Sequence, residues 1–112
     1  MKKVLYYAMN GDKMCFLHVL LNALDLSEAG AEVKIIFEGS SVKLPSLLNE
    51  EKNKLYLKAI DAGLIAGICK ACSRALDVYE ANTALGLPLL DDMNGHAGMR
   101  SYIESGWEVV SI

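Results

Sequence analysis

Two cysteines separated by two residues, Cys69 and Cys72, have the spacing in this sequence that best suits chemistry. They follow a short apolar run, Leu64–Ile68, and open a segment with helical spacing, which predicts Cys69 near the first residue of a helix and Cys72 in its first turn. Free backbone N–H groups at a helix start, together with Lys70 and Arg74 nearby, favour the thiolate over the thiol. The pair therefore indicates thiol or sulfur chemistry.

The same pair fits several kinds of site: a sulfur-accepting nucleophile, a redox dithiol, half of a metal site, or two small buried residues. A metal site needs two more ligands. Besides carboxylates the sequence offers only Cys15, His18 and His96, none of which forms a second spaced pair. We therefore expect no structural zinc site within one chain and no cofactor, whereas a metal shared between subunits stays open.

The elements that must position these thiols alternate along the chain. Short apolar runs of strand type are separated by longer stretches with helical spacing, and no linker, repeat or charged tail interrupts them. This alternation predicts a single domain over residues 1–112 with an α/β fold, in which a mainly parallel five-stranded sheet lies between helices in three α/β/α layers. The expected strands are Val4–Met9, Val33–Phe37, Leu64–Ile68, about Leu87–Leu90, and Trp107–Ile112.

Helical connections are expected between these strands. Pro45 interrupts the stretch Val42–Leu48, so regular helix in that connection is expected only further along. A later helical region breaks near Asp77, whose side chain could cap a new start. The expected helical segments are Lys13–Ala29, Asn53–Ala62, Ala71–Leu85 and Gly95–Ser105.

Ligands of parallel sheets gather where loops leave the carboxyl ends of the strands. By this rule the loops supply Asn10, Gly11 and Asp12 from the first, Glu38, Gly39 and Ser40 from the second, Cys69 to Cys72 from the third, and Asp91, Asp92, Asn94 and His96 from the fourth. His96 could reach a neighbouring thiolate as an acid or base, although such a histidine often only forms loop hydrogen bonds. Both cysteines are therefore expected at the edge of the sheet that carries function.

Composition excludes several other classes of function. The chain has 11 Lys and Arg against 14 Asp and Glu, a net charge of −3, with the basic residues scattered among acidic ones. No cluster of positive charge is available for nucleic-acid phosphates. The longest apolar run, Ala62 to Cys69, has eight residues, far short of the roughly 18–20 that cross a membrane. An odd number of cysteines argues against a secreted disulfide framework, so we expect a cytoplasmic protein.

The order of these features resembles the DsrE/DsrF-like family of small sulfur-relay proteins. The resemblance spans nearly the whole chain and is carried by the opening run Val4–Met9, the run Leu64–Cys69 that ends in a cysteine, and the closing segments Leu89–Gly95 and Met99–Val110. It implies a three-layer fold of the flavodoxin-like topology class, oligomeric assembly, and a cysteine that carries sulfane sulfur as a persulfide. The family's carrier cysteine corresponds by position to Cys69.

The leading hypothesis is a cytoplasmic homo-oligomer that accepts sulfane sulfur on Cys69 from a donor and passes it to an acceptor protein. Cys72 would resolve or share the sulfur, with Lys70, His96 and Asn10 as auxiliary residues. A second hypothesis is a redox-sensitive interaction module without turnover, in which the two thiols close reversibly and alter an oligomer interface. A third is a structural subunit whose cysteines are simply buried.

Overall fold

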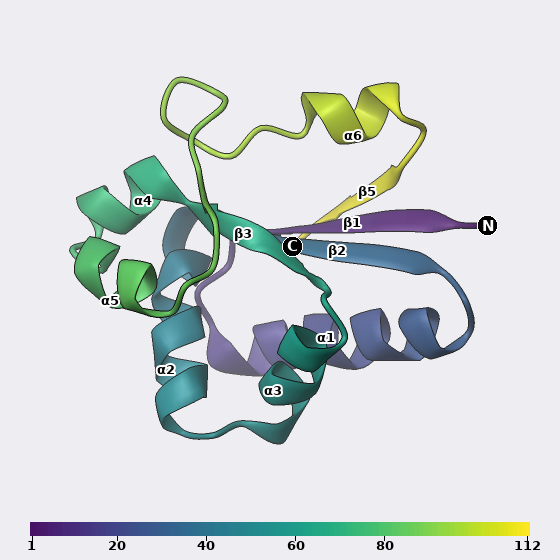
Figure 1. Cartoon of the computed structure of the whole chain (residues 1–112), viewed down its shortest axis with the longest axis horizontal. Helices are drawn as coiled ribbons and strands as arrows, with labels where there is room; N and C mark the ends of the chain where they lie inside the picture. The colour runs from purple at the N-terminus through teal and green to yellow at the C-terminus, as the bar shows by residue number, and fades with distance from the viewer.

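A computed structural model of the protein describes the whole chain, Met1–Ile112, and shows one sheet of five parallel strands in the order β4-β3-β2-β1-β5 (Figure 1). The predicted α/β fold is confirmed, and all five expected strands are present with small shifts at their ends. The strands are β1 (Lys3–Ala8), β2 (Glu32–Phe37), β3 (Ile65–Cys69), β4 (Leu89–Leu90) and β5 (Glu108–Ser111).

Helices flank the sheet to give the three expected layers. In Figure 1, α1, α2 and α3 lie on one side of the sheet and α6 on the other, while α4 and α5 lie toward the end where β3 leaves the sheet. The helices are α1 (Lys13–Glu28), α2 (Leu44–Glu50), α3 (Lys54–Asp61), α4 (Lys70–Ala75), α5 (Tyr79–Ala84) and α6 (Arg100–Glu104), and a 3₁₀ helix, η1 (Gly39–Lys43), precedes α2.

The central strands are apolar because both of their faces are covered. Residues Val4 to Ala8 of β1 are all buried, and Phe37 at the end of β2 packs against Phe16 of α1 with ring centroids 4.9 Å apart. Even α1, the longest helix with 16 residues, lacks the combination of length and apolar character needed to cross a membrane.

Two expectations about helix boundaries were wrong. Pro45 does not interrupt helix but lies in the first turn of α2, where the N–H that proline lacks has no intrahelical partner. Asp77 does not cap a new helix either. It adopts a left-handed backbone (φ 61°) after the end of α4, and Val78 is the first flanking residue of α5, without a side-chain cap. A short acidic side chain tolerates this conformation, which reverses the chain between the two helices.

Gly67 allows β4 to lie close to β3. A Cβ atom at this position would stand 2.7 Å from both the Pro88 carbonyl oxygen and the Leu90 side chain. Only glycine therefore permits the β3–β4 pairing of Ile68 with Leu89 and of Cys69 with Leu90. This pairing sets the start of the loop that follows β4 and carries His96.

Candidate functional site

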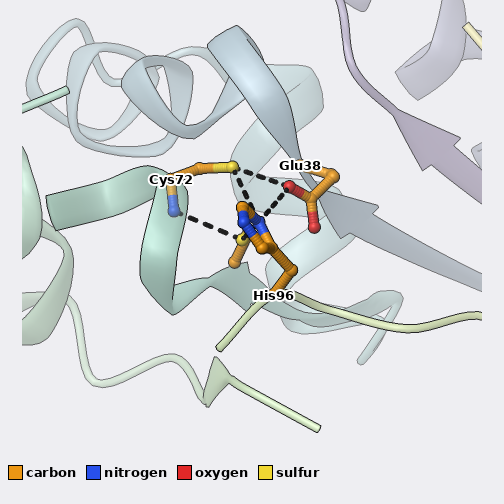
Figure 2. Close-up of side chains that lie close together, drawn as sticks. Glu38, Cys72 and His96 are labelled. Atoms are coloured by element: carbon orange, nitrogen blue, oxygen red, sulfur yellow. Dashed lines mark hydrogen bonds and ion pairs between the residues drawn. The ribbon is translucent and has the colours of Figure 1, made fainter. Parts of the chain in front are cut away.

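Four polar side chains meet at the carboxyl edge of the sheet. Glu38 follows β2, Cys69 ends β3, Cys72 lies in α4, and His96 comes from the loop after β4; their Oε, Sγ, Sγ and ring nitrogen atoms all lie within 4.8 Å of one another. Figure 2 shows Glu38, Cys72 and His96 pointing toward one another. We call these four residues the thiol cluster. The cluster lies at the edge predicted from the strand ends, and the fold brings both cysteines and His96 together there.

Cys69 is the innermost member of the cluster. It is the N-cap of α4, and its Sγ accepts a hydrogen bond of 3.3 Å from the backbone N–H of Cys72. Its carbonyl accepts a 2.7 Å hydrogen bond from the hydroxyl of buried Ser73. The residue has 0% exposure, so its sulfur lies beneath the other side chains of the cluster.

Cys72 is half-buried and lies nearer the surface. Its thiol donates a hydrogen bond of 2.6 Å to Oε1 of Glu38. Because a thiol that donates to a carboxylate must keep its proton, this contact holds Cys72 in the neutral form.

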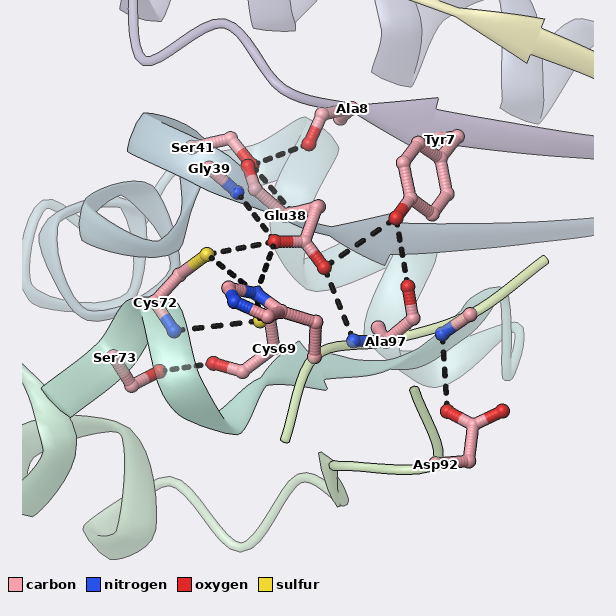
Figure 3. A network of polar contacts seen from close by, with 12 residues as sticks. Tyr7, Ala8, Glu38, Gly39, Ser41, Cys69, Cys72, Ser73, Asp92 and Ala97 are labelled. Carbon is pink, nitrogen blue, oxygen red and sulfur yellow. Dashed lines mark hydrogen bonds and ion pairs between the residues drawn. The ribbon is translucent and has the colours of Figure 1, made fainter. Parts of the chain in front are cut away.

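Glu38 is held from several directions (Figure 3). Oε1 accepts a hydrogen bond from the Gly39 N–H and Oε2 one from the Ala97 N–H, each 3.1 Å long. The Tyr7 hydroxyl, 3.4 Å from Oε2, donates its shorter bond of 2.7 Å to the Ala97 carbonyl. The carboxylate is therefore fixed although Glu38 is only 4% exposed, and the basic side chain beside it is His96, whose Nδ1 lies 3.3 Å from Oε1.

A tight turn presents His96 to the cluster. Asn94 and Gly95 both have positive φ, 51° and 89°, and Met93 and His96 exchange backbone hydrogen bonds of 2.9 and 2.8 Å across them. Positive φ at both central residues is typical of an Asn-Gly hairpin turn. The expected helix over Gly95–Ser105 was therefore wrong in its first half, and α6 begins only at Arg100.

This turn is tied to the helix that carries the cysteines. The Gly95 carbonyl accepts a 2.8 Å hydrogen bond from the Ala71 N–H at the start of α4. The His96 side chain is 43% exposed, and its Nδ1 lies 3.2 Å from Cys69 Sγ and 3.4 Å from Cys72 Sγ. Nδ1 also lies 3.3 Å from Glu38 Oε1, so a single nitrogen contacts all three other members of the cluster.

The protonation of the thiols differs from the sequence-based expectation. Burial raises the pKa of Cys69, a change that the Cys72 N–H partly offsets. Burial and then the Glu38 carboxylate raise the pKa of Cys72 to about 12. Burial also disfavours the ionised form of Glu38, but hydrogen bonds from the two thiols and two backbone N–H groups outweigh it and lower the pKa of Glu38. The resting cluster is therefore a carboxylate with two neutral thiols, and the prediction of a favoured thiolate was wrong.

The basic residues expected to favour the thiolate are engaged elsewhere. Lys70 Nζ lies 3.6 Å from the carboxylate of Asp91, and the Arg74 guanidinium stacks on the Tyr79 ring, 4.5 Å from its centroid. Lys70 and Arg74 line a cavity beside α4, and neither Cys69 nor Cys72 lines it.

Asn10 likewise lies outside the cluster. Its side-chain oxygen accepts a 2.8 Å hydrogen bond from the Asp12 N–H just before α1, and its own N–H donates to the Ile112 carbonyl. This residue shapes the first loop and the end of β5.

Two residues of the site, Glu38 and Tyr7, are missing from the sequence-based prediction of the site. The sequence places Glu38 only in the second loop and Tyr7 only within the first strand. The available signal was an acidic residue directly after the buried run of β2, beside the strand that ends in Cys69. A carboxylate at that place is expected to be held by other polar groups, because an unpaired buried charge is costly.

Comparisons with known proteins give relatives without an assigned activity. The uncharacterized protein MJ0733 of Methanocaldococcus jannaschii is 30% identical over 110 residues, which cover 96% of this chain and 88% of that protein. An uncharacterized protein of Archaeoglobus fulgidus is 41% identical over 44 residues, 39% of this chain and 72% of that protein.

A solved structure has the same fold. The conserved protein of unknown function BT1422 from Bacteroides thetaiotaomicron superposes with a TM-score of 0.75 over 99% of this chain and 95% of that chain, at 22% identity. No protein-family model matches the sequence.

Proposed function

We propose that this chain, which belongs to the same protein family as MJ0733 of Methanocaldococcus jannaschii, accepts sulfane sulfur on Cys69 as a persulfide and passes it to another thiol. The observation that carries the proposal is the contact of 3.2 Å between Cys69 Sγ and His96 Nδ1, with a second thiol and a carboxylate in the same cluster. A thiol beside an imidazole has a partner that can take its proton.

Sulfur acceptance at Cys69 needs no outside oxidant or reductant. The Cys69 proton moves to His96 Nδ1 as Sγ attacks the outer sulfur of a donor R–S–SH. The S–S bond of the donor breaks, and R–S⁻ leaves with the bonding electron pair and takes the proton from the imidazole. The products are Cys69–S–SH and R–SH. An acceptor thiol then attacks the outer sulfur of Cys69–S–SH in the same way, so the acceptor becomes the persulfide and Cys69 returns to the thiol. The N–H of Cys72, which already donates to Sγ, supports the anion during attack.

Glu38 keeps the Cys72 thiol from attacking a persulfide on Cys69. A neighbouring thiolate would attack Cys69–S–SH, form a Cys69–Cys72 disulfide and release the cargo as sulfide. The 2.6 Å hydrogen bond to Glu38 holds Cys72 as a neutral thiol, which is a poor nucleophile. Glu38 thereby protects a persulfide on Cys69 until an acceptor arrives.

Access to Cys69 runs past two partly exposed side chains. Cys72 and His96 lie beside its sulfur, and the imidazole is 43% exposed.

The resemblance to DsrE/DsrF-like sulfur-relay proteins supports this proposal through its compatible three-layer α/β architecture and through a cysteine at the end of an internal strand. Three free cysteines suit a reducing compartment, so the proposal places the protein in the cytoplasm.

The proposal also includes a homo-oligomer. The edge strand β5 leaves Val110 unpaired on one side and exposed, and Ile103 of α6 is 54% exposed. An open sheet edge with exposed apolar side chains is a surface that a second copy could cover. Sedimentation equilibrium at low protein concentration tests this part, and a single monomeric species would contradict it.

Persulfide mapping tests the central step. The reduced protein is incubated with a low-molecular-weight persulfide, blocked with an alkylating reagent and digested with trypsin, which cleaves after Lys70 and so separates Cys69 from Cys72. We expect a mass gain of one sulfur on the Cys69 peptide in the wild type and in Cys15→Ser, a matched control at an exposed cysteine. Cys69→Ser should lose the adduct, and its persistence on Cys72 or Cys15 alone would contradict the proposal.

The redox-module hypothesis has one supporting observation, since the two sulfurs lie within 4.8 Å of each other. Oxidant titration with thiol counting and size analysis separates the two functions. A disulfide that changes the assembly, in a protein that takes up no sulfane sulfur, favours the module.

A further inference from the structure

We propose that the thiol cluster is also a binding site for a thiophilic divalent metal ion of the zinc class, held by Glu38 Oε1, Cys69 Sγ, Cys72 Sγ and His96 Nδ1. The inference goes beyond sulfur transfer and does not depend on it. It stands on the convergence of four donor atoms of the types that zinc prefers, which lie within 4.8 Å of one another and come from three different segments of the chain.

Three of the six donor separations in the cluster are close to those of a tetrahedral site. Bond lengths of about 2.3 Å to sulfur and about 2.0–2.2 Å to nitrogen and oxygen imply donor separations of about 3.4 Å for N···O and about 3.6 Å for S···N and S···O. The observed separations are 3.3 Å from Nδ1 to Oε1, and 3.2 and 3.4 Å from Nδ1 to the two sulfurs. Three of the contacts are therefore already close to their metal-bound values.

The contact between Cys72 and Glu38 changes with the thiol proton. Cys72 Sγ donates to Glu38 Oε1 across 2.6 Å. When the thiol loses that proton to a metal, the attraction becomes a repulsion between two anions, and the pair opens by about 1 Å to reach the tetrahedral separation. The half-buried Cys72 side chain can make this movement by rotation about χ1.

The charges of the cluster also favour a cation. Glu38 is buried with no lysine or arginine as an ion-pair partner, and the nearby Lys70 is paired with Asp91. A buried carboxylate is normally paired or coordinates a metal. A divalent ion would bring positive charge to this anion and to the thiolates formed on binding.

The surrounding groups already orient the donors. Glu38 Oε2 is anchored by the Ala97 N–H, which leaves Oε1 to face the sulfurs, and the Cys72 N–H donates to Cys69 Sγ. Such outer contacts fix ligand geometry in metal sites. The cluster therefore needs little rearrangement to receive an ion.

The sequence contains no second spaced pair of cysteine or histidine, which is the usual signature of a metal site. The third and fourth ligands instead come singly from the loops after β2 and β4. Only the parallel order β4-β3-β2 brings Glu38 and His96 to the same sheet end as Cys69.

Metal titration of the reduced, chelator-treated chain, with no sulfur donor present, tests the inference. We expect one Zn²⁺ per chain in competition with a chromophoric chelator, and with Co²⁺ we expect thiolate-to-cobalt charge-transfer bands and the intense visible bands of tetrahedral coordination. Cys72→Ser and Glu38→Gln should each weaken zinc binding by at least about tenfold. The matched controls Cys15→Ser and His18→Gln, both at exposed residues of α1, should bind as the wild type does.

Thiol protection supplies a second measurement that does not depend on variants. Bound Zn²⁺ should slow alkylation of both Cys69 and Cys72 by at least about tenfold and leave Cys15 unaffected, because a coordinated thiolate is masked. A wild-type chain that takes up no Zn²⁺ or Co²⁺, or an equal loss of binding in Cys15→Ser, would overturn the inference. Neither outcome bears on sulfur uptake, which the persulfide mapping measures separately.

Discussion

Replacing Glu38 with glutamine removes the negative charge beside Cys72 while nearly preserving the size of the side chain. In the wild type, Oε1 accepts the Cys72 thiol hydrogen bond of 2.6 Å, and the pKa of Cys72 is raised from 9.0 to about 12, by burial first and by Glu38 second. We therefore predict that Glu38→Gln makes Cys72 more reactive toward an alkylating reagent. The direction is opposite to that expected if Glu38 activated the thiol as a base.

The size of the effect follows from two opposing factors. Each pKa unit removed increases the thiolate fraction about tenfold, but a less basic thiolate is less nucleophilic, with a Brønsted coefficient of about 0.4–0.5. The net gain is about 3- to 4-fold in rate for each unit. Burial remains in the variant, so we expect about one to two units to be lost and the rate to rise about 3- to 15-fold.

Iodoacetamide labelling at about pH 8, followed by tryptic peptide mapping, measures this rate because Cys72 and Cys69 fall on different peptides. The exposed Cys15 serves as an internal reference in the same sample. Glu28→Gln, which removes an exposed charge at the end of α1, is the matched control and should leave the Cys72 rate unchanged. An unchanged or slower rate in Glu38→Gln would refute the protective role of Glu38.

Three further predictions concern the framework of the site. Tyr7→Phe should lower the free energy of unfolding in urea by about 1–2 kcal/mol, because the buried Ala97 carbonyl loses its 2.7 Å donor; an unchanged midpoint would show that water replaces the hydroxyl. Gly67→Ala should cost about 1–3 kcal/mol, since its Cβ would stand 2.7 Å from the Pro88 oxygen; stability equal to the wild type in the same titration would count against the close approach of β4. Because the pKa of Glu38 is lower in the folded chain, ionised Glu38 stabilises the fold at pH values above its ordinary pKa of 4.5. This contribution is lost as the pH falls through the lower pKa of the folded chain. Urea titrations between about pH 6 and about pH 3 should therefore show that the free energy of unfolding falls less in Glu38→Gln than in the wild type. An equal fall in both proteins would contradict the pKa shift.

Local sequence signals predicted most of the fold. The apolar runs Val33–Phe37 and Leu64–Ile68 match β2 and β3 within one residue at each end, because strands covered on both faces have continuous apolar sequences. The helix boundaries were mispredicted where a residue type is compatible with two different local structures. Pro45 ends a helix when it is internal but fits one when it lies in the first turn, and the sequence does not state which position it occupies.

The site was predicted only in part, for a physical reason. Cys69, Cys72 and His96 are polar or reactive residues at strand ends, so a rule about sheet edges found them. The role of Glu38 depends on contacts with residues far away in the chain, including Cys72, 34 positions later, and Ala97, 59 positions later. The protonation of the thiols was mispredicted for the same reason, because the burial that mainly raises the pKa of Cys72 and the Glu38 carboxylate that adds to it both arise from segments distant in the chain.

The two proposed occupants of the thiol cluster differ in how many thiol protons must leave. Sulfur acceptance requires an anion at Cys69 alone, and the hydrogen bond from Cys72 to Glu38 opposes a second deprotonation. A divalent ion removes both protons, since each coordinated thiol must be a thiolate, and it turns Glu38 from the partner of a neutral thiol into a ligand. The same carboxylate thus disfavours the doubly ionised cluster without a metal and stabilises it with one. Because both proposed occupants need the Cys69 sulfur, a bound metal ion would exclude a persulfide, and the two proposals together predict that added Zn²⁺ lowers sulfur uptake on Cys69.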